Sequence, residues 1–123
     1  MLAGRRVLVI EDEYFIADDI ARAIRQLGAE IVGPYPTLAE ALATLDLPEP
    51  IDAAVVDIDL RGELAFQAAD ELLARGVPFV FSTGYDVTAV PTAYCNVPHW
   101  QKPFNPDALA RALPSMLRAS SIG

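Results

Sequence analysis

The chain has 123 residues, 53% of them hydrophobic, and its 9 lysines and arginines against 17 aspartates and glutamates give a net charge of −8. This length predicts one domain with one core, and the acidic balance argues against binding of nucleic acid or of an anionic membrane surface. A single cysteine, Cys95, and a single histidine, His99, exclude metal sites built from several cysteines or histidines. No apolar run approaches the ~20 residues of a membrane span, so a cytoplasmic protein is the default expectation.

Apolar runs and helical periodicity alternate along the chain. In chain order, the sequence predicts a strand at Arg6–Ile10, a helix from Phe15 to Leu27, a strand at Glu30–Gly33, a helix from Thr37 to about Leu45, a strand at Ala53–Asp57, a helix at Leu64–Arg75, strands at Pro78–Ser82 and Pro98–Gln101, and a helix from Pro106 to about Arg118. Strands that are apolar on both faces are typical of parallel sheets covered by helices. The predicted fold class is therefore α/β, a doubly wound five-stranded parallel sheet flanked by helices.

The stretch between the last two strands differs from the rest. Pro91 interrupts it, and no helical apolar stripe runs through Tyr85–Val97, so the fourth helix is predicted to be short or irregular. We expect this segment to be the least protected in hydrogen exchange and to be a two-state element. The last residues resemble a frayed end, which predicts a domain at 1–119 and a disordered tail at 120–123.

Polar side chains gather where the predicted strands end. Ligands of such a sheet bind beyond the carboxyl ends of its strands. Those ends carry the acids Glu11, Asp12, Glu13 and Asp57, the hydroxyl pair Ser82 and Thr83, and Lys102. Since clustered histidines and cysteines are absent from the sequence, a metal there must be held by oxygens, which suits Mg²⁺. The carboxylate of Asp57 can act as a nucleophile toward phosphorus, with Lys102 and Thr83 offering a positive charge and a hydroxyl to the phosphoryl oxygens.

Four short motifs, each at the end of a predicted strand, resemble those of one family, the receiver domain of two-component response regulators. The motifs are Val7–Glu13, Val55–Leu60, Phe81–Tyr85 and Lys102–Phe104. The resemblance covers essentially the whole chain and implies a flavodoxin-like fold of the receiver type. The third motif, a Phe-x-Thr-Gly-Tyr pattern, is similar to that of an atypical subgroup common in alphaproteobacteria.

The resemblance implies a role for each site residue. Asp57 is the expected phosphoryl acceptor, and Thr83 and Lys102 are expected to contact the phosphoryl oxygens. Because successive strand residues point to opposite faces, only one of Ser82 and Thr83 can face the site, so Ser82 is the alternative to Thr83 for this contact. In the family, the peptide bond between the lysine and the following proline is usually cis. The expected ligands of Mg²⁺ are Asp12 and Asp57 directly, Glu11 through water, and the backbone carbonyl of Asp59.

Two positions depart from the usual pattern of the family. Arg61 stands where receivers usually have a proline. His99 stands three residues before Lys102, where receivers usually carry an aromatic switch residue. His99 is therefore either the switch or an ordinary surface or packing histidine.

The implied function is a phosphorylation-switched signalling receiver. It would accept a phosphoryl group from a sensor histidine kinase or a phosphotransfer protein and signal to a downstream protein partner, with a homodimer left open. It would catalyse its own phosphorylation and dephosphorylation without turning over an external substrate. One alternative is a haloacid-dehalogenase-type phosphatase, because Asp57–Asp59 resembles the DxD motif of that family, and another is an inert pseudo-receiver that only binds. The chain is either a stand-alone receiver or a fragment of a longer protein.

Overall fold

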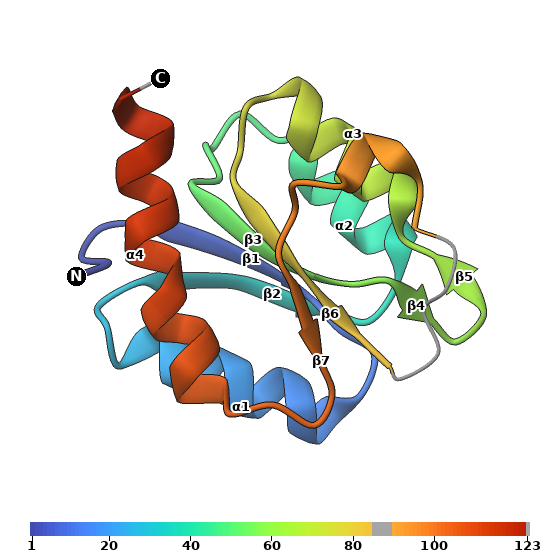
Figure 1. The fold of residues 1–123 in the computed structure, drawn as a ribbon, viewed down its shortest axis with the longest axis horizontal. Helices are drawn as coiled ribbons and strands as arrows, with labels where there is room; N and C mark the ends of the chain where they lie inside the picture. Colours follow the sequence, from blue (N-terminus) through green and yellow to red (C-terminus); the bar gives the residue numbers. More distant parts are fainter. Residues whose placement is uncertain (85–89, 123) are drawn as a thin grey trace.

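A sheet of five parallel strands forms the centre of the molecule (Figure 1). The computed structural model describes residues 1–84 and 90–122, and the side chains of 1–84 and 90–117. The strand order is β2-β1-β3-β6-β7, and every neighbouring pair is parallel. The strands are β1 (Arg6–Ile10), β2 (Glu30–Tyr35), β3 (Ala53–Asp57), β6 (Phe79–Thr83) and β7 (His99–Gln101).

Helices cover both faces of this sheet. Figure 1 shows α1 (Tyr14–Arg25) and α4 (Pro106–Ile122) on one face, and α2 (Leu38–Leu45) and α3 (Phe66–Ala74) on the other. Alternate strand residues point to opposite faces, so Val9 and Val55 pack toward α1 and α4, whereas Ile10 packs toward α2 and α3. This arrangement confirms the predicted doubly wound α/β fold.

Local side-chain chemistry sets the helix boundaries. Thr37 caps α2, because its hydroxyl accepts a hydrogen bond from the backbone N–H of Glu40 at 3.2 Å and donates one to the Glu40 carboxylate at 2.9 Å. Asn105 caps α4 in the same way, accepting from the N–H of Asp107 at 2.8 Å. These caps fix the starts of α2 and α4, at or next to the predicted helix starts at Thr37 and Pro106.

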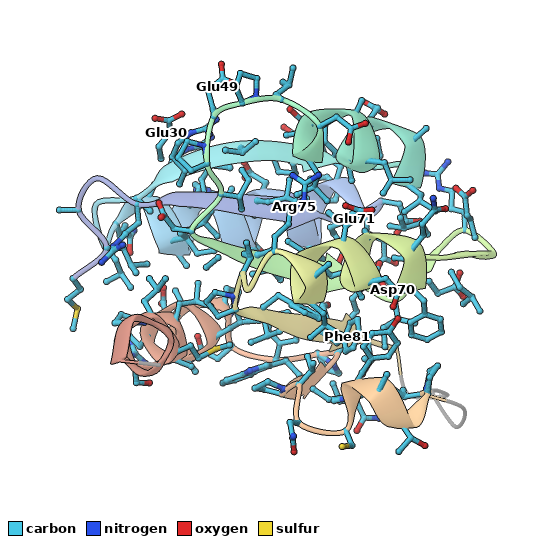
Figure 2. All side chains as sticks on the ribbon, turned by 90° about the horizontal axis from the view of Figure 1, so that it is seen from above. Glu30, Glu49, Asp70, Glu71, Arg75 and Phe81 are labelled. Atoms are coloured by element: carbon cyan, nitrogen blue, oxygen red, sulfur yellow. The ribbon has the colours of Figure 1, made fainter. Side chains whose placement is uncertain are left out.

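The side chain of Arg75 joins α3 to α2. Its guanidinium donates to the carbonyl of Leu45 and lies 3.6 Å from the carboxylate of Asp46 and 3.3 Å from that of Glu71. Figure 2 shows Arg75 and Glu71 on the surface of α3. This contact ties the two helices on that face to each other as well as to the sheet.

Several boundaries differ from the sequence-based prediction. A hairpin of two short strands, β4 (Asp59–Leu60) and β5 (Glu63–Leu64), precedes α3. It includes Leu64, the first residue of the predicted helix, and α3 begins at Phe66 instead. The final helix α4 continues to Ile122, beyond its predicted end near Arg118. The domain limits of 1–119 with a tail at 120–123 stay a prediction. None of the described helices combines the length and the apolar character that a membrane crossing requires.

In the described part of residues 85–97, the predicted short or irregular fourth helix is confirmed as a 3₁₀ turn, η1 (Thr92–Tyr94). Part of the predicted two-state segment, residues 85–89, lies outside the described residues. In the described part, Tyr94 is buried at 3% exposure and packs into the core under α3. This end of the segment is therefore anchored, which the sequence pattern did not indicate.

Candidate functional site

An open cleft of about 720 Å³ lies at the carboxyl ends of the strands. The loop after β1, the hairpin β4–β5 after β3, and the start of α4 bound it, which is where ligands of parallel sheets are expected. Its polar lining comprises Asp12, Glu13, Asp19, Asp57, Asp59, Arg61 and Lys102, and its apolar lining includes Ile16 and Phe104.

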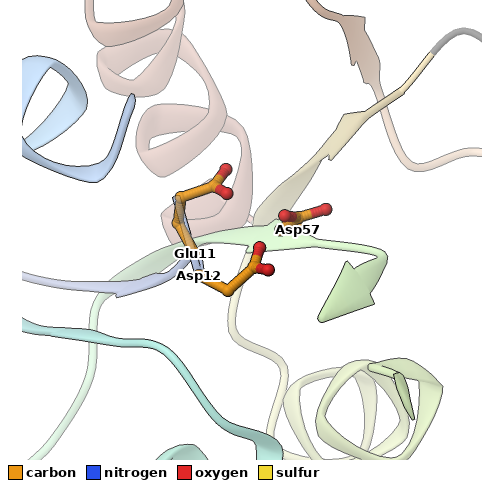
Figure 3. Close-up of side chains that lie close together, drawn as sticks. All are labelled: Glu11, Asp12 and Asp57. Carbon is orange, nitrogen blue, oxygen red and sulfur yellow. The ribbon is translucent and has the colours of Figure 1, made fainter. Parts of the chain in front are cut away.

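Three carboxylates from two strands converge in this cleft. One oxygen each of Glu11, Asp12 and Asp57 lies within 4.8 Å of the other two, and Figure 3 shows the three side chains turned toward one another. Glu11 is 2% exposed and Asp57 is 3% exposed. The neighbouring strands β1 and β3 carry these residues at their adjacent ends, which is why residues far apart in sequence meet here.

Lys102 supplies the positive charge for two of these carboxylates. Its ammonium nitrogen lies 3.2 Å from Oδ2 of Asp57 and 3.0 Å from Oε1 of Glu11, and it donates a hydrogen bond to Oε2 of Glu11 at 3.1 Å. It also lies 3.3 Å from Glu13. The backbone N–H of Lys102 donates to the carbonyl of Thr83 at 2.8 Å, and the following bond to Pro103 is cis. The expectation of a cis bond is thus confirmed.

Burial and charge shift the pKa values in this cluster. The pKa of Asp57 is raised from 3.8 to about 9. Burial is the largest cause, the hydrogen bond and negative charge of Glu11 act in the same direction, and the ammonium of Lys102 opposes them. Burial lowers the pKa of Lys102, but the charge of Asp57 and the contacts with Glu11 outweigh burial, so the pKa of Lys102 lies above its usual value. The cluster therefore keeps Lys102 charged and favours a proton on Asp57.

The hairpin β4–β5 places a second cation beside the carboxylates. Arg61 and Gly62 form its turn, and both have positive φ angles, 56° and 91°. The guanidinium Nε of Arg61 lies 3.4 Å from Oδ2 of Asp12. Asp59 holds the turn from the other side, since its Oδ1 accepts a hydrogen bond from the N–H of Gly62 at 2.6 Å. The N–H of Asp59 in turn donates to Oδ1 of Asp57 at 3.1 Å.

Thr83 and Ser82 lie at the end of β6, beside β3. Both are buried, at 4% and 0% exposure. The sheet register pairs Ser82 with Asp57, so strand alternation puts Ser82 on the face of Asp57 and turns Thr83 toward the other face at the last position of the strand. Among the described residues, the hydroxyl of Ser82 finds no hydrogen-bond partner. The part of Thr83 that contacts the site directly is its carbonyl, through Lys102.

His99 is exposed on the edge strand β7, with its ring centroid 5.3 Å from that of Phe81. The buried ring next to Phe81 belongs to Tyr94 instead, at 5.6 Å. The ring of Tyr94 also stacks on Phe66 at 5.3 Å, and its hydroxyl donates to the carbonyl of Phe66 at 3.1 Å and to the carboxylate of Asp70. Figure 2 labels Asp70 and Phe81 near η1. The switch role of His99 stays a prediction.

The contacts of three residues in this region were not predicted from the sequence. Glu13 completes the acidic surroundings of Lys102, Arg61 pairs with Asp12, and Tyr94 anchors η1. The acidic run Glu11–Glu13 does place Glu13 at the same strand end as the site acids. No periodicity or motif pointed to the other two contacts, because each depends on the path of a loop. The structure does bring the predicted Glu11, Asp12, Asp57 and Lys102 together, and it places Asp59 in the adjoining turn.

No protein-family model matches the chain. An 82-residue stretch is 34% identical to the transcriptional regulatory protein PdtaR of Mycobacterium tuberculosis. This stretch takes in 66% of the present chain and 40% of PdtaR, so the chain spans less than half of that relative. The predicted alphaproteobacterial subgroup stays a prediction.

Solved structures resemble the whole chain. The solution structure of SdrG from Sphingomonas melonis Fr1 is 39% identical, with a TM-score of 0.80 over 95% of this chain and 99% of SdrG. A response regulator receiver protein from Sinorhizobium medicae, 20% identical, shares the fold with a TM-score of 0.79 over 98% of this chain and 99% of that one. A CheY-like receiver domain protein from Methanospirillum hungatei, 22% identical, does so with a TM-score of 0.76 over 95% and 96%. The chain thus belongs to the receiver-domain family of response regulators.

Proposed function

We propose that Asp57 accepts a phosphoryl group from the phosphohistidine of a sensor histidine kinase or a phosphotransfer protein. The observation that carries this proposal is the buried carboxylate of Asp57 at the floor of an open cleft, 3.2 Å from the ammonium of Lys102 and beside two further acids. Burying an acid among acids costs stability. A role in phosphoryl transfer gives a reason for that cost, since the same arrangement receives a group with three anionic oxygens.

The chemical step is a displacement at phosphorus. An oxygen of the ionised Asp57 attacks phosphorus, and the bond from phosphorus to the donor imidazole breaks. The imidazole leaves with the bonding electron pair and takes up a proton. Lys102 lies where its ammonium can pair with one phosphoryl oxygen. The family pattern gives the contact with a second oxygen to the hydroxyl of Thr83, and Ser82 is the alternative donor because the sheet register puts it on the face of Asp57. Hydrolysis of the acyl phosphate by water would return Asp57 to its free form.

Mg²⁺ belongs to the same proposal. The donor set fits a hard cation, since it consists of three clustered carboxylates. Oε1 of Glu11 is buried, and its contact among the described residues is the ion pair with Lys102 at 3.0 Å, so two buried acids share one protein cation. Asp12 and Asp57 would hold the ion directly, Glu11 through water, and the backbone carbonyl of Asp59 would complete the protein ligands. A bound Mg²⁺ would neutralise these acids and offset the charge of the phosphoryl oxygens.

The proposed output is a contact with a downstream protein partner, with a homodimer as an open possibility for the signalling form. A cytoplasmic location belongs to the same proposal, because a histidine kinase draws its phosphoryl group from ATP inside the cell. The phosphatase alternative has less support. In that family acids later in the chain bind the metal, whereas the acids that lie beside Asp57 here, Glu11 and Asp12, come before it in the chain.

Mass spectrometry tests the proposal. Incubation with phosphoramidate and Mg²⁺ should add one phosphoryl group to the wild-type chain and none to Asp57→Asn. Asp46→Asn is the matched control, because its carboxylate is 81% exposed and lies away from the cleft. A chelator should suppress the gain. If Asp57→Asn gains the same mass as the wild type, the acceptor has been assigned wrongly.

A further inference from the structure

Arg61 occupies a fixed place at the rim of the cleft. The hairpin that carries it pairs Asp59 with Leu64 and Leu60 with Glu63. Its root is anchored in two ways, because Leu60 is 4% exposed and the N–H of Ala65 donates to the carbonyl of Ile58 at 2.8 Å. Two central residues with positive φ are the geometry of a tight type I′ turn, in which asparagine and glycine are favoured and arginine is unusual.

Two cations divide the acidic cluster between them. Lys102 contacts Glu11 and Asp57, but no contact between Lys102 and Asp12 occurs among the described residues. Asp12 has its own partner, the guanidinium of Arg61 at 3.4 Å. Asp12 is 10% exposed as a side chain, whereas Arg61 is 82% exposed. The carboxylate is therefore held in place, and its counter-ion is free to move into solvent.

We propose that Arg61 is a counter-ion of Asp12 that competes with the divalent cation for this carboxylate and so lowers the affinity of the site for metal. The inference rests on the metal site of the proposed function. A cation that binds Asp12 must displace the guanidinium or share the carboxylate with it, and two like charges at that distance repel each other. Because Arg61 is mostly exposed, water weakens the pair, and the effect on affinity is graded rather than absolute.

Arg61→Asn is the sharpest test variant. It removes the charge while putting a residue favoured at positive φ into the turn, so the hairpin should be at least as stable as in the wild type. Arg61→Gly removes the charge together with the rest of the side chain. Arg61→Lys keeps a positive charge. Arg22→Gln is the control, because Arg22 forms an exposed pair with Asp18 at 3.2 Å, outside the acidic cluster.

Binding of Mg²⁺ is measured by calorimetric titration, and binding of Mn²⁺ by the electron paramagnetic resonance signal of the free ion. Both neutral Arg61 variants should bind about two- to fivefold more tightly than the wild type, the range expected for losing an exposed ion pair. Arg61→Lys and Arg22→Gln should stay near the wild type. The advantage of the neutral variants should shrink as NaCl is added, since salt screens exposed charges.

Equal or weaker binding by Arg61→Asn and Arg61→Gly would overturn the inference, as would a gain of the same size in Arg22→Gln. A failure of the metal site itself gives a different result. In that case the wild type and all variants would show no saturable binding, and both the proposed Mg²⁺ site and the role of Arg61 would be wrong.

Discussion

Burial of the Asp57 carboxylate costs folding free energy. The side chain is 3% exposed, and its nearest charged neighbours are one ammonium and a second buried acid, Glu11. A single cation shared between two carboxylates offsets only part of the desolvation of both. The pKa of Asp57 is raised for this reason, because a proton on its carboxylate removes one of the two poorly compensated negative charges of the metal-free site.

This imbalance predicts how stability depends on pH. A carboxyl whose pKa rises on folding, here from 3.8 to about 9, holds a proton in the folded chain and not in the unfolded one, so its contribution to stability falls as pH rises through that window. Asp57→Asn removes the ionisation and keeps the shape. In chelator-containing buffer we expect it to exceed the wild type in stability at about pH 8 by at least ~1 kcal/mol, or roughly 3–6 °C in Tm, and by less at about pH 5.

Thermal unfolding followed by circular dichroism checks this prediction. Glu49→Gln, at an exposed side chain outside the cleft, should track the wild type at both pH values. A gain for Asp57→Asn that is the same at both pH values would mean that improved packing, and not the ionisation of Asp57, is responsible.

At the scale of elements, η1 depends on one side chain. The hydroxyl of Tyr94 donates to the carbonyl of Phe66 and to the carboxylate of Asp70, which together tie η1 to α3. Burial, followed by the hydrogen bond and charge of Asp70, raises the pKa of Tyr94 to about 12, so the hydroxyl keeps its proton at neutral pH. The ring alone would still stack on Phe66 at 5.3 Å.

Tyr94→Phe separates these two contributions. Loss of the hydroxyl should cost about 0.5–1.5 kcal/mol. The backbone N–H groups of Cys95 and Val97, which bond to the carbonyls of Thr92 and Tyr94, should then exchange with deuterium about two- to tenfold faster. Tyr14→Phe is the control, because Tyr14 is 74% exposed. Unchanged exchange at Cys95 and Val97 would show that stacking alone anchors η1.

The central strands were predictable because a strand buried on both faces of the sheet is a continuous run of apolar residues. Ala53–Asp57 has the same limits in the prediction and in the structure, and strand ends brought the site acids together. The hairpin was not predictable in this way. Its turn uses Arg61 at a positive φ, a residue that carries no turn signal, and Leu64 was assigned to the following helix because it fits the helical spacing. Pairing of Arg61 with Asp12 follows only from the path of that turn.

The contacts of Tyr94 were missed for a related reason. Pro91 indicated an interrupted segment, and the described part of it contains a 3₁₀ turn, η1. The lack of a helical apolar stripe suggested that this segment is weakly attached to the core. Attachment by one aromatic residue, Tyr94, produces no such stripe. The partners Phe66 and Asp70 lie on α3, and only the packing of η1 against that helix reveals them.

For the molecule as a whole, metal binding should act as a stabilising ligand. A cation that binds the folded cleft and not the unfolded chain adds about 1.4 kcal/mol at ten times its Kd. The melting temperature of the wild type should therefore rise by roughly 4–8 °C with Mg²⁺ at that level. Asp12→Asn should lose most of this rise, because it removes one of the three clustered carboxylates. A full rise in Asp12→Asn would place the ion elsewhere.

Figure 1 shows both ends of the described chain on the side of the molecule away from the carboxyl ends of β1 and β3. The cleft includes Pro106, the first residue of α4, and 17 residues of helix at 1.5 Å each carry the chain about 25 Å beyond it. The other end leads into β1 at Arg6, the end of that strand opposite the site acids. A domain joined directly to the end of α4 would therefore begin about 25 Å from the cleft. The shortest path from Asp57 to such a domain runs through the sheet and α4, so a small displacement of α4 would be enough to carry the signal to it.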